Sequence, residues 1–420
     1  MLTLRCDFSD KLLNLALFLM GLTSTFMILQ FYNHGIVWFL GTLSATVIII
    51  TKRKINVKIF DVPFFLFLIS LLLTVRFAVV SVVSTAMLFL IALQLQSCHK
   101  KEFHIFIQGV KVSCLFNICW CILQFILFKF INFNINDFLF IDTFHMVEKA
   151  SFDKYLTGMA WHPINLAPVL LLSVLFFDNW IVWGMCFFIA VNASSSTTIL
   201  ALVMAFFLLR MKDIKLTYKL KKSLPVHQSM IIIIGAFILV IALYFLFPVI
   251  LDELQRLLNR VSGSTDRSTY LHKRYYTSVF YVFANSKPYD ILFGCGYHQS
   301  GLVFSRLFNQ FTRLTSWSVE SDPMDYLYGN GIIGFSLFYT FLIGNLIRSW
   351  FSDYKLFCFY AVIIVCGIAY NCQFEWVMML ELIFEVMRKK GINVFEKSKH
   401  NKWHLFDSYK DFANVIYDID

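Results

Sequence analysis

The sequence predicts an all-α polytopic membrane protein with about 12 transmembrane helices. The first reason is composition: 59% of the 420 residues are apolar and 15% are charged, whereas soluble domains have about 45–50% and about 25%. The second reason is that long apolar runs recur along the whole chain, and the third is that basic residues concentrate between alternate runs. This composition excludes a water-soluble enzyme and a disordered or fibrous protein.

Twelve apolar runs approach the length of about 20 residues that a membrane-spanning helix needs. They cover residues 11–31, 36–51, 59–75, 77–96, 103–129, 164–178, 180–192, 197–210, 229–250, 323–347, 356–371 and 374–387. Only Asp178 and Asn179 separate the sixth run from the seventh. The cysteines of these runs, which include Cys114, Cys119, Cys121, Cys186 and Cys366, form no CxxC pair and are interpreted as small buried apolar residues.

The basic residues predict the orientation of these helices. They follow the second, fourth, eighth, tenth and twelfth runs, as Lys52, Arg53, Lys54, Lys58, Lys100, Lys101, Arg210, Lys212, Lys215, Lys219, Lys221, Lys222, Arg348, Lys355, Arg388, Lys389 and Lys390. If twelve helices alternate in direction, all of these lie on one side, and the short segments 32–35, 193–196 and 372–373 on the other side carry no Lys or Arg. The positive-inside rule then places both termini in the cytoplasm.

This topology divides the chain into four regions. They are 1–250 with helices 1–9 and an outer segment at 130–163, the large extracytoplasmic loop 251–322, 323–387 with helices 10–12, and the cytoplasmic tail 388–420. The loop 251–322 is unusually basic for an outer segment, but long loops translocate regardless of their charge. Its charge therefore agrees with the predicted topology and draws attention to the loop as a site of chemistry.

The arginines of the large loop are candidate ligands for a diphosphate on a lipid carrier. A guanidinium group binds phosphate oxygens in a bidentate manner and can stabilise a departing diphosphate. Arg267, which lies among turn residues at a predicted helix start, is the first candidate, and Arg274 is the second. The alternative is that these arginines contact lipid headgroups or pair with acidic residues such as Asp266.

An acidic trio marks the end of this loop and the start of the tenth helix. Glu320, Asp322 and Asp325 surround Pro323, and proline is favoured in the first turn of a helix. Acidic residues there complement the helix dipole, which is the structural interpretation. The functional interpretation is a general base at the membrane surface, for which Glu320 is the better candidate because it precedes the helix. The following Gly329, Gly331 and Gly334 indicate close helix packing.

Two further places carry polar residues of interest. The stretch before the sixth helix includes His162 and Asn165, which are expected to line an outer vestibule. No cysteine or acidic residue stands at metal-ligand spacing from His162, so no metal site is predicted. In the last helix, Glu381 and Glu385 share one face, and an acidic residue as deep as Glu381 indicates function by default. Lys111 and Arg76 are its candidate partners.

Three local patterns resemble the O-antigen polymerase (Wzy) and O-antigen ligase superfamily. Residues 158–167 resemble the pattern G-x-x-x-N-P-N-x-x-A, with His162 where asparagine is usual. Residues 266–270 and 293–297 resemble the pair G-R-x-x-x-W and f-G-x-G. Residues 320–334 resemble H/E-N/S-x-x-L followed by G-x-x-G. The chain departs from the family at 196–198, Ser-Thr-Thr, where Ser-Arg-Thr is common.

The resemblance implies a GT-C-like glycosyltransferase of the cell inner membrane, acting without metal or cofactor at the extracytoplasmic face. It would transfer glycan from undecaprenyl diphosphate onto a lipid-linked repeat unit. The implied catalytic residues are Glu320 on the acceptor hydroxyl and Arg267 on the diphosphate, and the implied substrate-binding residues are Arg274, His162, Asn165, His298 and Asp322. The implied partners are the undecaprenyl-diphosphate-linked oligosaccharide, the lipid bilayer and a chain-length regulator protein, with no nucleic acid.

Two other functions stay open at this point. Ligases of the superfamily transfer finished glycan to the lipid A core and have histidine at the position of Glu320, so glutamate here favours the polymerase branch. A lipid-linked sugar flippase is the second alternative. Transporters often contain repeated halves with a site at the bilayer midplane. The sequence has no internal repeat and concentrates charge in one outer loop, which favours an enzyme.

Overall fold

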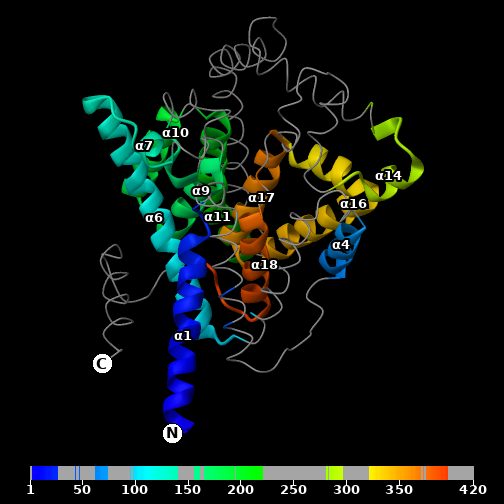
Figure 1. Cartoon of the computed structure of the whole chain (residues 1–420), viewed down its shortest axis with the longest axis horizontal. Coiled ribbons are helices and arrows are strands. Elements are labelled where there is room, and N and C mark those ends of the chain that lie inside the picture. Colours follow the sequence, from blue (N-terminus) through cyan, green and yellow to red (C-terminus); the bar gives the residue numbers. More distant parts are fainter. Residues whose placement is uncertain are drawn as a thin grey trace, which may run out of the picture.

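All regular elements in the described part of the chain are helices (Figure 1). The computed structural model describes residues 2–26, 43, 47, 62–73, 95, 98–140, 156–160, 165–193, 195–220, 281, 283–296, 321–369, 372 and 375–395. The elements are α1 (Leu2–Thr23), α4 (Val62–Leu72), α6 (Lys100–Ile131), α7 (Ile135–Phe140), the 3₁₀ turn η2 (Gly158–Ala160), α9 (Leu166–Phe177), α10 (Trp180–Asn192), α11 (Ser196–Leu220), α14 (Pro288–Phe293), α16 (Asp322–Ser352), α17 (Tyr354–Ala369) and α18 (Glu375–Lys389). The all-α prediction is confirmed for these residues.

Nine of the twelve predicted runs coincide with helices in the described residues, namely α1, α4, α6, α9, α10, α11, α16, α17 and α18. The runs 36–51, 77–96 and 229–250 lie outside them, apart from Leu43, Val47 and Leu95. Two of the helices, α6 and α16, are long and apolar enough to cross a membrane. A 12-residue helix such as α9 is only about 18 Å long, whereas the bilayer core is about 30 Å thick.

The first predicted run, 11–31, needs a correction at its end. The helix ends at Thr23, and a turn follows through Phe26. The hydroxyl groups of Thr23 and Ser24 donate hydrogen bonds to the carbonyl oxygens of Leu19 (2.8 Å) and Gly21 (2.7 Å). These side-chain hydrogen bonds lie in the last turn and the turn that follows, where the helix stops although the apolar run continues in the sequence.

Helices α1 and α6 run side by side in close contact (Figure 1). A Cβ atom added to Gly21 would overlap the carbonyl oxygen of Phe106, and one added to Gly109 would overlap that of Phe18. The two glycines face each other, since each lies within reach of the other's Cα. Small residues at such a crossing allow two backbones to approach closely, as at many membrane helix interfaces.

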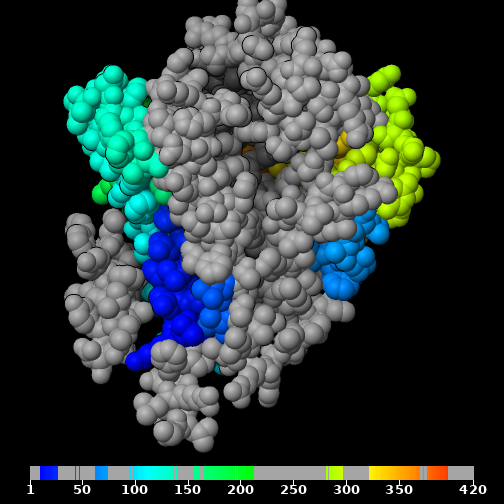
Figure 2. Space-filling view, in the orientation of Figure 1, coloured from blue at the N-terminus to red at the C-terminus, as the bar shows by residue number. Residues whose placement is uncertain are grey.

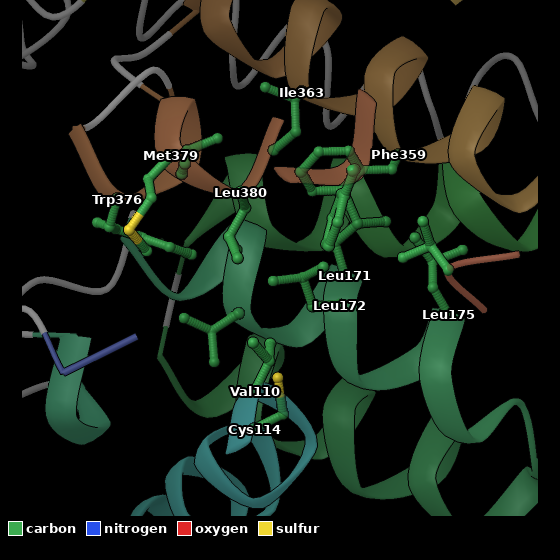
Figure 3. Close-up of a cluster of buried hydrophobic side chains, with 14 of the residues drawn as sticks. Val110, Cys114, Leu171, Leu172, Leu175, Phe359, Ile363, Trp376, Met379 and Leu380 are labelled. Carbon is green, nitrogen blue, oxygen red and sulfur yellow. The ribbon is translucent and has the colours of Figure 1, made fainter. Parts of the chain in front are cut away.

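The core of the described residues surrounds α9. Every residue of α9 from Leu166 to Phe176 is buried, and a helix that is apolar all round belongs in the interior. Figure 3 shows the packing at one part of this core, where Val110 of α6, Leu172 of α9, Phe359 of α17 and Leu380 of α18 converge. The cysteine prediction is confirmed for Cys114, Cys121, Cys186 and Cys366, which are buried, whereas Cys119 is exposed on the other face of α6.

The outward faces of several helices are apolar. Helix α4 exposes Val62 and Leu72, and α10 exposes Trp180 and Ile181, each by more than half. Figure 2 shows α4 in blue and α14 in yellow-green at one edge of the molecule. Extended exposed apolar surface is unusual for a monomer in water and is typical of contact with lipid or with another protein.

Helix ends that the sequence assigned to the cytoplasmic side meet at one end of the bundle. Lys355 Nζ donates to the carbonyl oxygen of Leu175 (2.7 Å) and lies 3.4 Å from Asp178 Oδ2, at the end of α9. Lys390 Nζ donates to the carbonyl oxygen of Cys98 (2.7 Å), just before α6. Lys355 thus lies at the negative end of the α9 dipole beside an acidic side chain, and Lys390 connects the end of α18 to the segment before α6. The grouping agrees with helices that alternate in direction.

Asp353, at this same end, carries the first testable prediction. Its Oδ1 accepts hydrogen bonds from the backbone N–H groups of Lys355 (3.1 Å) and Leu356 (3.2 Å) at the start of α17. Burial raises the pKa of the Asp353 carboxyl above its ordinary value of 3.8, and these hydrogen bonds offset only part of the rise. The folded protein therefore holds this proton more tightly than the unfolded chain does.

Ionisation of Asp353 therefore favours unfolding. Below its ordinary pKa of 3.8, Asp353 adds nothing to the pH dependence of stability. The free energy of unfolding then falls as pH rises from there through the raised pKa. We expect Asp353→Asn, which keeps the accepting oxygen but has no charge, to flatten this dependence. Unfolding of both proteins in detergent between about pH 4 and about pH 8 measures it. An identical pH slope in the two proteins would contradict the prediction.

Candidate functional site

Two of the three sequence patterns meet in the structure at a break in α16. Residues 294–296, which follow α14, lie against residues 328–331 of α16. Cys295 N donates to the carbonyl oxygen of Tyr328, and Gly296 N donates to that of Gly329, both at 3.0 Å. Helix α16 is interrupted here because Gly331 has φ 64° and ψ −175°. We call these contacts the α14–α16 joint.

Glycine is required on both sides of this joint. Gly294 has φ 86°, and a Cβ atom there would overlap the carbonyl group of Gly329. A Cβ atom on Gly331 would overlap the carbonyl group of Leu292 and lie 2.6 Å from Gly294 N. Gly334 leaves room for the side chains of Asn330 and Ser70. The packing interpretation of Gly331 and Gly334 is thus confirmed, and the partner of the joint is the second sequence pattern.

The start of α16 is fixed by Asp322, one of the predicted substrate-binding residues. Its side chain is buried, and Oδ2 accepts a hydrogen bond from Cys372 N (2.9 Å) in the connection between α17 and α18. The carboxylate fills the space beside Gly367, where a Cβ atom would overlap Oδ2. Burial, followed by the nearby Asp322 charge, raises the pKa of the Cys372 thiol well above its ordinary value. Asp322 therefore ties α16 to the ends of two other helices.

The turn that carries the first sequence pattern is held by amide side chains. Gln124 Oε1 of α6 accepts hydrogen bonds from Thr157 N (3.2 Å) and Gly158 N (3.1 Å). Asn117 Oδ1, two turns earlier on α6, accepts one from Met159 N (3.0 Å). Backbone groups in a buried turn need such partners, because each one left without a hydrogen bond is costly. Helix α6 therefore positions this turn.

Asn165, the other predicted substrate-binding residue in the described part of the chain, closes the same turn. It is 6% exposed, and its Nδ2 donates to the carbonyl oxygen of Ala160 (3.1 Å). The side chain is therefore buried in this structure, and one hydrogen of its amide is used by the carbonyl of η2. Its predicted contact with substrate stays a prediction.

The remaining predicted site residues lie outside the described residues. These are Arg267, Arg274, His162, His298 and Glu320. Two described residues are close to them in the sequence. Gly296, near His298, belongs to the α14–α16 joint, and Ser321, which follows Glu320, precedes the first turn of α16. Within the described segments there is no group of three or more His, Cys, Asp or Glu side chains that could hold a metal ion.

The amide ladder on α6 was missed by the sequence analysis. Asn117 and Gln124 are seven residues apart, so they lie on the same face of the helix, and both are buried. Asn136 extends the ladder, because its Nδ2 donates to the carbonyl oxygen of Gly158 (2.8 Å) and its Oδ1 accepts from Trp120 Nε1 (2.8 Å). The available signal was the presence of polar amides at helical spacing within the apolar run 103–129.

Comparison with known proteins adds no relative: no protein-family model matches this sequence, and no curated protein matches it.

Proposed function

We propose that this protein is a polysaccharide polymerase of the O-antigen type, anchored in the cell inner membrane. It would transfer a glycan from undecaprenyl diphosphate onto a lipid-linked repeat unit at the extracytoplasmic face. The proposal starts from the three sequence patterns at 158–167, 266–297 and 320–334. Its main support from the fold is that the second and third patterns contact each other directly.

The α14–α16 joint is the observation that carries this proposal. Sequence patterns that arise by chance have no reason to be adjacent in space, whereas parts of one catalytic unit must be. Here Gly294 and Gly331, the glycines of two separate patterns, fit together without room for a Cβ atom on either. The joint ties the end of one pattern to the middle of the other, close to the predicted base Glu320 in the sequence.

The proposed reaction follows from the residue types. A hydroxyl group of the lipid-linked repeat unit attacks the anomeric carbon of the donor glycan, while the bond from that carbon to the diphosphate oxygen breaks. Glu320 accepts the proton of the attacking hydroxyl. Arg267, assisted by Arg274, neutralises the charge that develops on the departing lipid diphosphate. His162 and His298 contribute further contacts to the sugars.

The predicted topology suits this chemistry. With both termini in the cytoplasm, the α14–α16 joint, the start of α16 and the turn η2 all belong to the extracytoplasmic half, where lipid-linked repeat units would be joined. The lysine contacts at the ends of α6, α9, α17 and α18 gather the ends that this topology assigns to the cytoplasm. Apolar outward faces on α4 and α10 suit contact with lipid.

A deletion strain tests the function. We expect its lipopolysaccharide or surface glycan to show a single repeat unit on the core, with no ladder on a gel, and complementation to restore the ladder. Bare core with polymer left on the lipid carrier would instead indicate a ligase. Bare core with single lipid-linked units trapped inside the cell would indicate a flippase. An unchanged glycan pattern would overturn the proposal.

Within the complemented strain, Arg267→Ala tests the proposed phosphate ligand. We expect long chains to disappear while the protein stays inserted at the wild-type level, because charge on the leaving diphosphate is no longer neutralised. Loss of such a charge contact costs about 2.7–4 kcal/mol in the transition state, or about 10²–10³ in rate. Arg256→Ala in the same loop is the matched control and should leave the ladder unchanged. Normal long chains from Arg267→Ala would remove this residue from the site.

A further inference from the structure

The break in α16 contains a buried amide with no structural role in the described fold. Asn330 lies between Gly329 and Gly331, is 0% exposed, and packs over Gly334 in the first turn after the break. Neither Oδ1 nor Nδ2 of Asn330 has a hydrogen-bond partner in the part of the chain that the structure describes. Burying an amide without partners opposes folding, so a residue of this kind is expected to have a further polar partner.

The helix break makes this position suitable for a ligand. The part of α16 that follows Gly331 begins a new helical segment of 21 residues, from Ile332 to Ser352. The start of a helix presents backbone N–H groups and a positive dipole end. Interrupted membrane helices place binding sites at such starts, because irregular backbone within a membrane has to be satisfied by protein or ligand. The unpartnered amide of Asn330 lies at this start.

The chemistry of the amide selects the ligand class. Asn330 Nδ2 needs an acceptor and Oδ1 needs a donor. A phosphate diester offers acceptors only and would leave Oδ1 without a partner. A sugar hydroxyl both donates and accepts, and two neighbouring hydroxyls can satisfy both atoms of one amide. Ser70 Oγ of α4 lies beside Gly334 and adds a further polar atom near the amide.

We propose that the break in α16 is a sugar subsite, in which the Asn330 amide binds hydroxyl groups of the glycan substrate. This inference rests on the proposed function for its substrate class. Residues 294–296 cover the break, because Gly294 packs on the backbone nitrogen of Asn330. Because Asn330 is 0% exposed, a sugar reaches its amide only after a local opening of the fold, and release of the two backbone hydrogen bonds between residues 295–296 and α16 is the opening we propose.

A pair of matched substitutions separates a ligand role from a structural one. Asn330→Leu keeps the branch at Cγ and loses no hydrogen bond of the described fold, but its methyl groups are larger than the amide. We expect the melting temperature of the full chain in detergent to fall less for this variant than for the comparison variant. Asn117→Leu changes another fully buried asparagine, which donates to Thr25 Oγ1 (2.9 Å) and accepts from Met159 N (3.0 Å). That variant should melt several degrees lower. Equal decreases in melting temperature in the two variants would show that Asn330 has a structural role, and this would overturn the proposal.

Two functional readouts complete the test. In cells, Asn330→Leu should reduce chain extension at least tenfold at normal protein level, and wild-type chain lengths would overturn the proposal. With purified protein, oligosaccharide fragments of the strain's own surface glycan should raise the melting temperature of the wild type but not of Asn330→Leu. Equal shifts in both proteins, or none in the wild type, would also overturn it.

The binding readout does not depend on polymerase activity. If the deletion strain keeps its glycan ladder but the fragments stabilise only the wild type, the polymerase proposal fails and the sugar subsite stands. If the ladder is lost on deletion but Asn330→Leu keeps normal chain lengths and binding, the polymerase stands and the subsite fails. Each proposal can therefore fail separately from the other.

Discussion

Gly331→Ala is expected to lower the free energy of unfolding by about 3 kcal/mol or more, and to remove the glycan ladder. The backbone at Gly331 has φ 64° and ψ −175°, a conformation that only glycine adopts readily and that costs any other residue about 1–3 kcal/mol. The new methyl group would also overlap the carbonyl group of Leu292, and overpacking of this kind typically costs about 1–3 kcal/mol more. Unfolding of the purified protein in detergent measures the loss.

The matched control is Gly184→Ala in α10. A Cβ atom at Gly184 meets nothing within 4 Å, and alanine is about 0.8–1 kcal/mol more favourable than glycine inside a helix. This variant should therefore be as stable as the wild type or slightly more stable, with a normal ladder. If Gly331→Ala were equally well tolerated, the break in α16 and the α14–α16 joint would not exist as described.

The functional part of this prediction distinguishes the joint from ordinary packing. Gly21→Ala disturbs the crossing of α1 and α6 at a comparable backbone contact, far in sequence from the proposed site. We expect both variants to lose stability, but at a temperature where each is still folded only Gly331→Ala should lack long chains. The reason is that Gly331 links two sequence patterns of the proposed active site.

Glu385→Gln is expected to cost about 3 kcal/mol of unfolding free energy. The Glu385 side chain is 0% exposed, and Arg388 Nε and Nη2 donate to its two oxygens at 2.8 and 2.7 Å. Arg348 Nη1 and Lys389 Nζ lie 3.6 and 3.5 Å from Oε1. Removing one member of a buried ion pair costs about 3–5 kcal/mol, and the lower end applies because Arg348 and Lys389 are partly exposed.

Lys389→Gln provides the comparison for this second substitution. Lys389 is 39% exposed, and an exposed ion pair contributes about 0–1 kcal/mol. The free energy of unfolding of the lysine variant should therefore lie within about 1 kcal/mol of the wild-type value. The difference between the two proteins should shrink further in high salt. Similar losses for Glu385→Gln and Lys389→Gln would show that Glu385 is not the centre of this cluster. Because Arg348 lies near the end of α16 and Glu385 near the end of α18, the cluster also ties the two helices at the predicted cytoplasmic end.

The helix positions could be predicted because they depend on local composition. In lipid, a run of apolar residues satisfies its own backbone hydrogen bonds as a helix, and the nine runs that fall in the described residues are helices. The basic residues at their ends, such as Lys355 and Lys390, predicted one shared side for these ends, and the contacts of both lysines agree with that prediction. The glycines 331 and 334 indicated close packing, because their lack of a side chain is itself a local property.

Other features depended on which segments become neighbours, and a single sequence does not contain that information in readable form. Asp322 was interpreted as an acidic residue at a helix start that contacts substrate, and its side chain is buried against Gly367 of α17. Asn165 looked like a vestibule residue and bonds to its own turn. Arg388 and Lys389 are neighbours of Glu385 on α18, but Glu385 gained Arg348, and Gly294 its contact with Gly329, only when distant segments came together. Composition and periodicity determined the helices, whereas the packing of distant segments decided which polar groups pair and which, like Asn330, are left for a ligand.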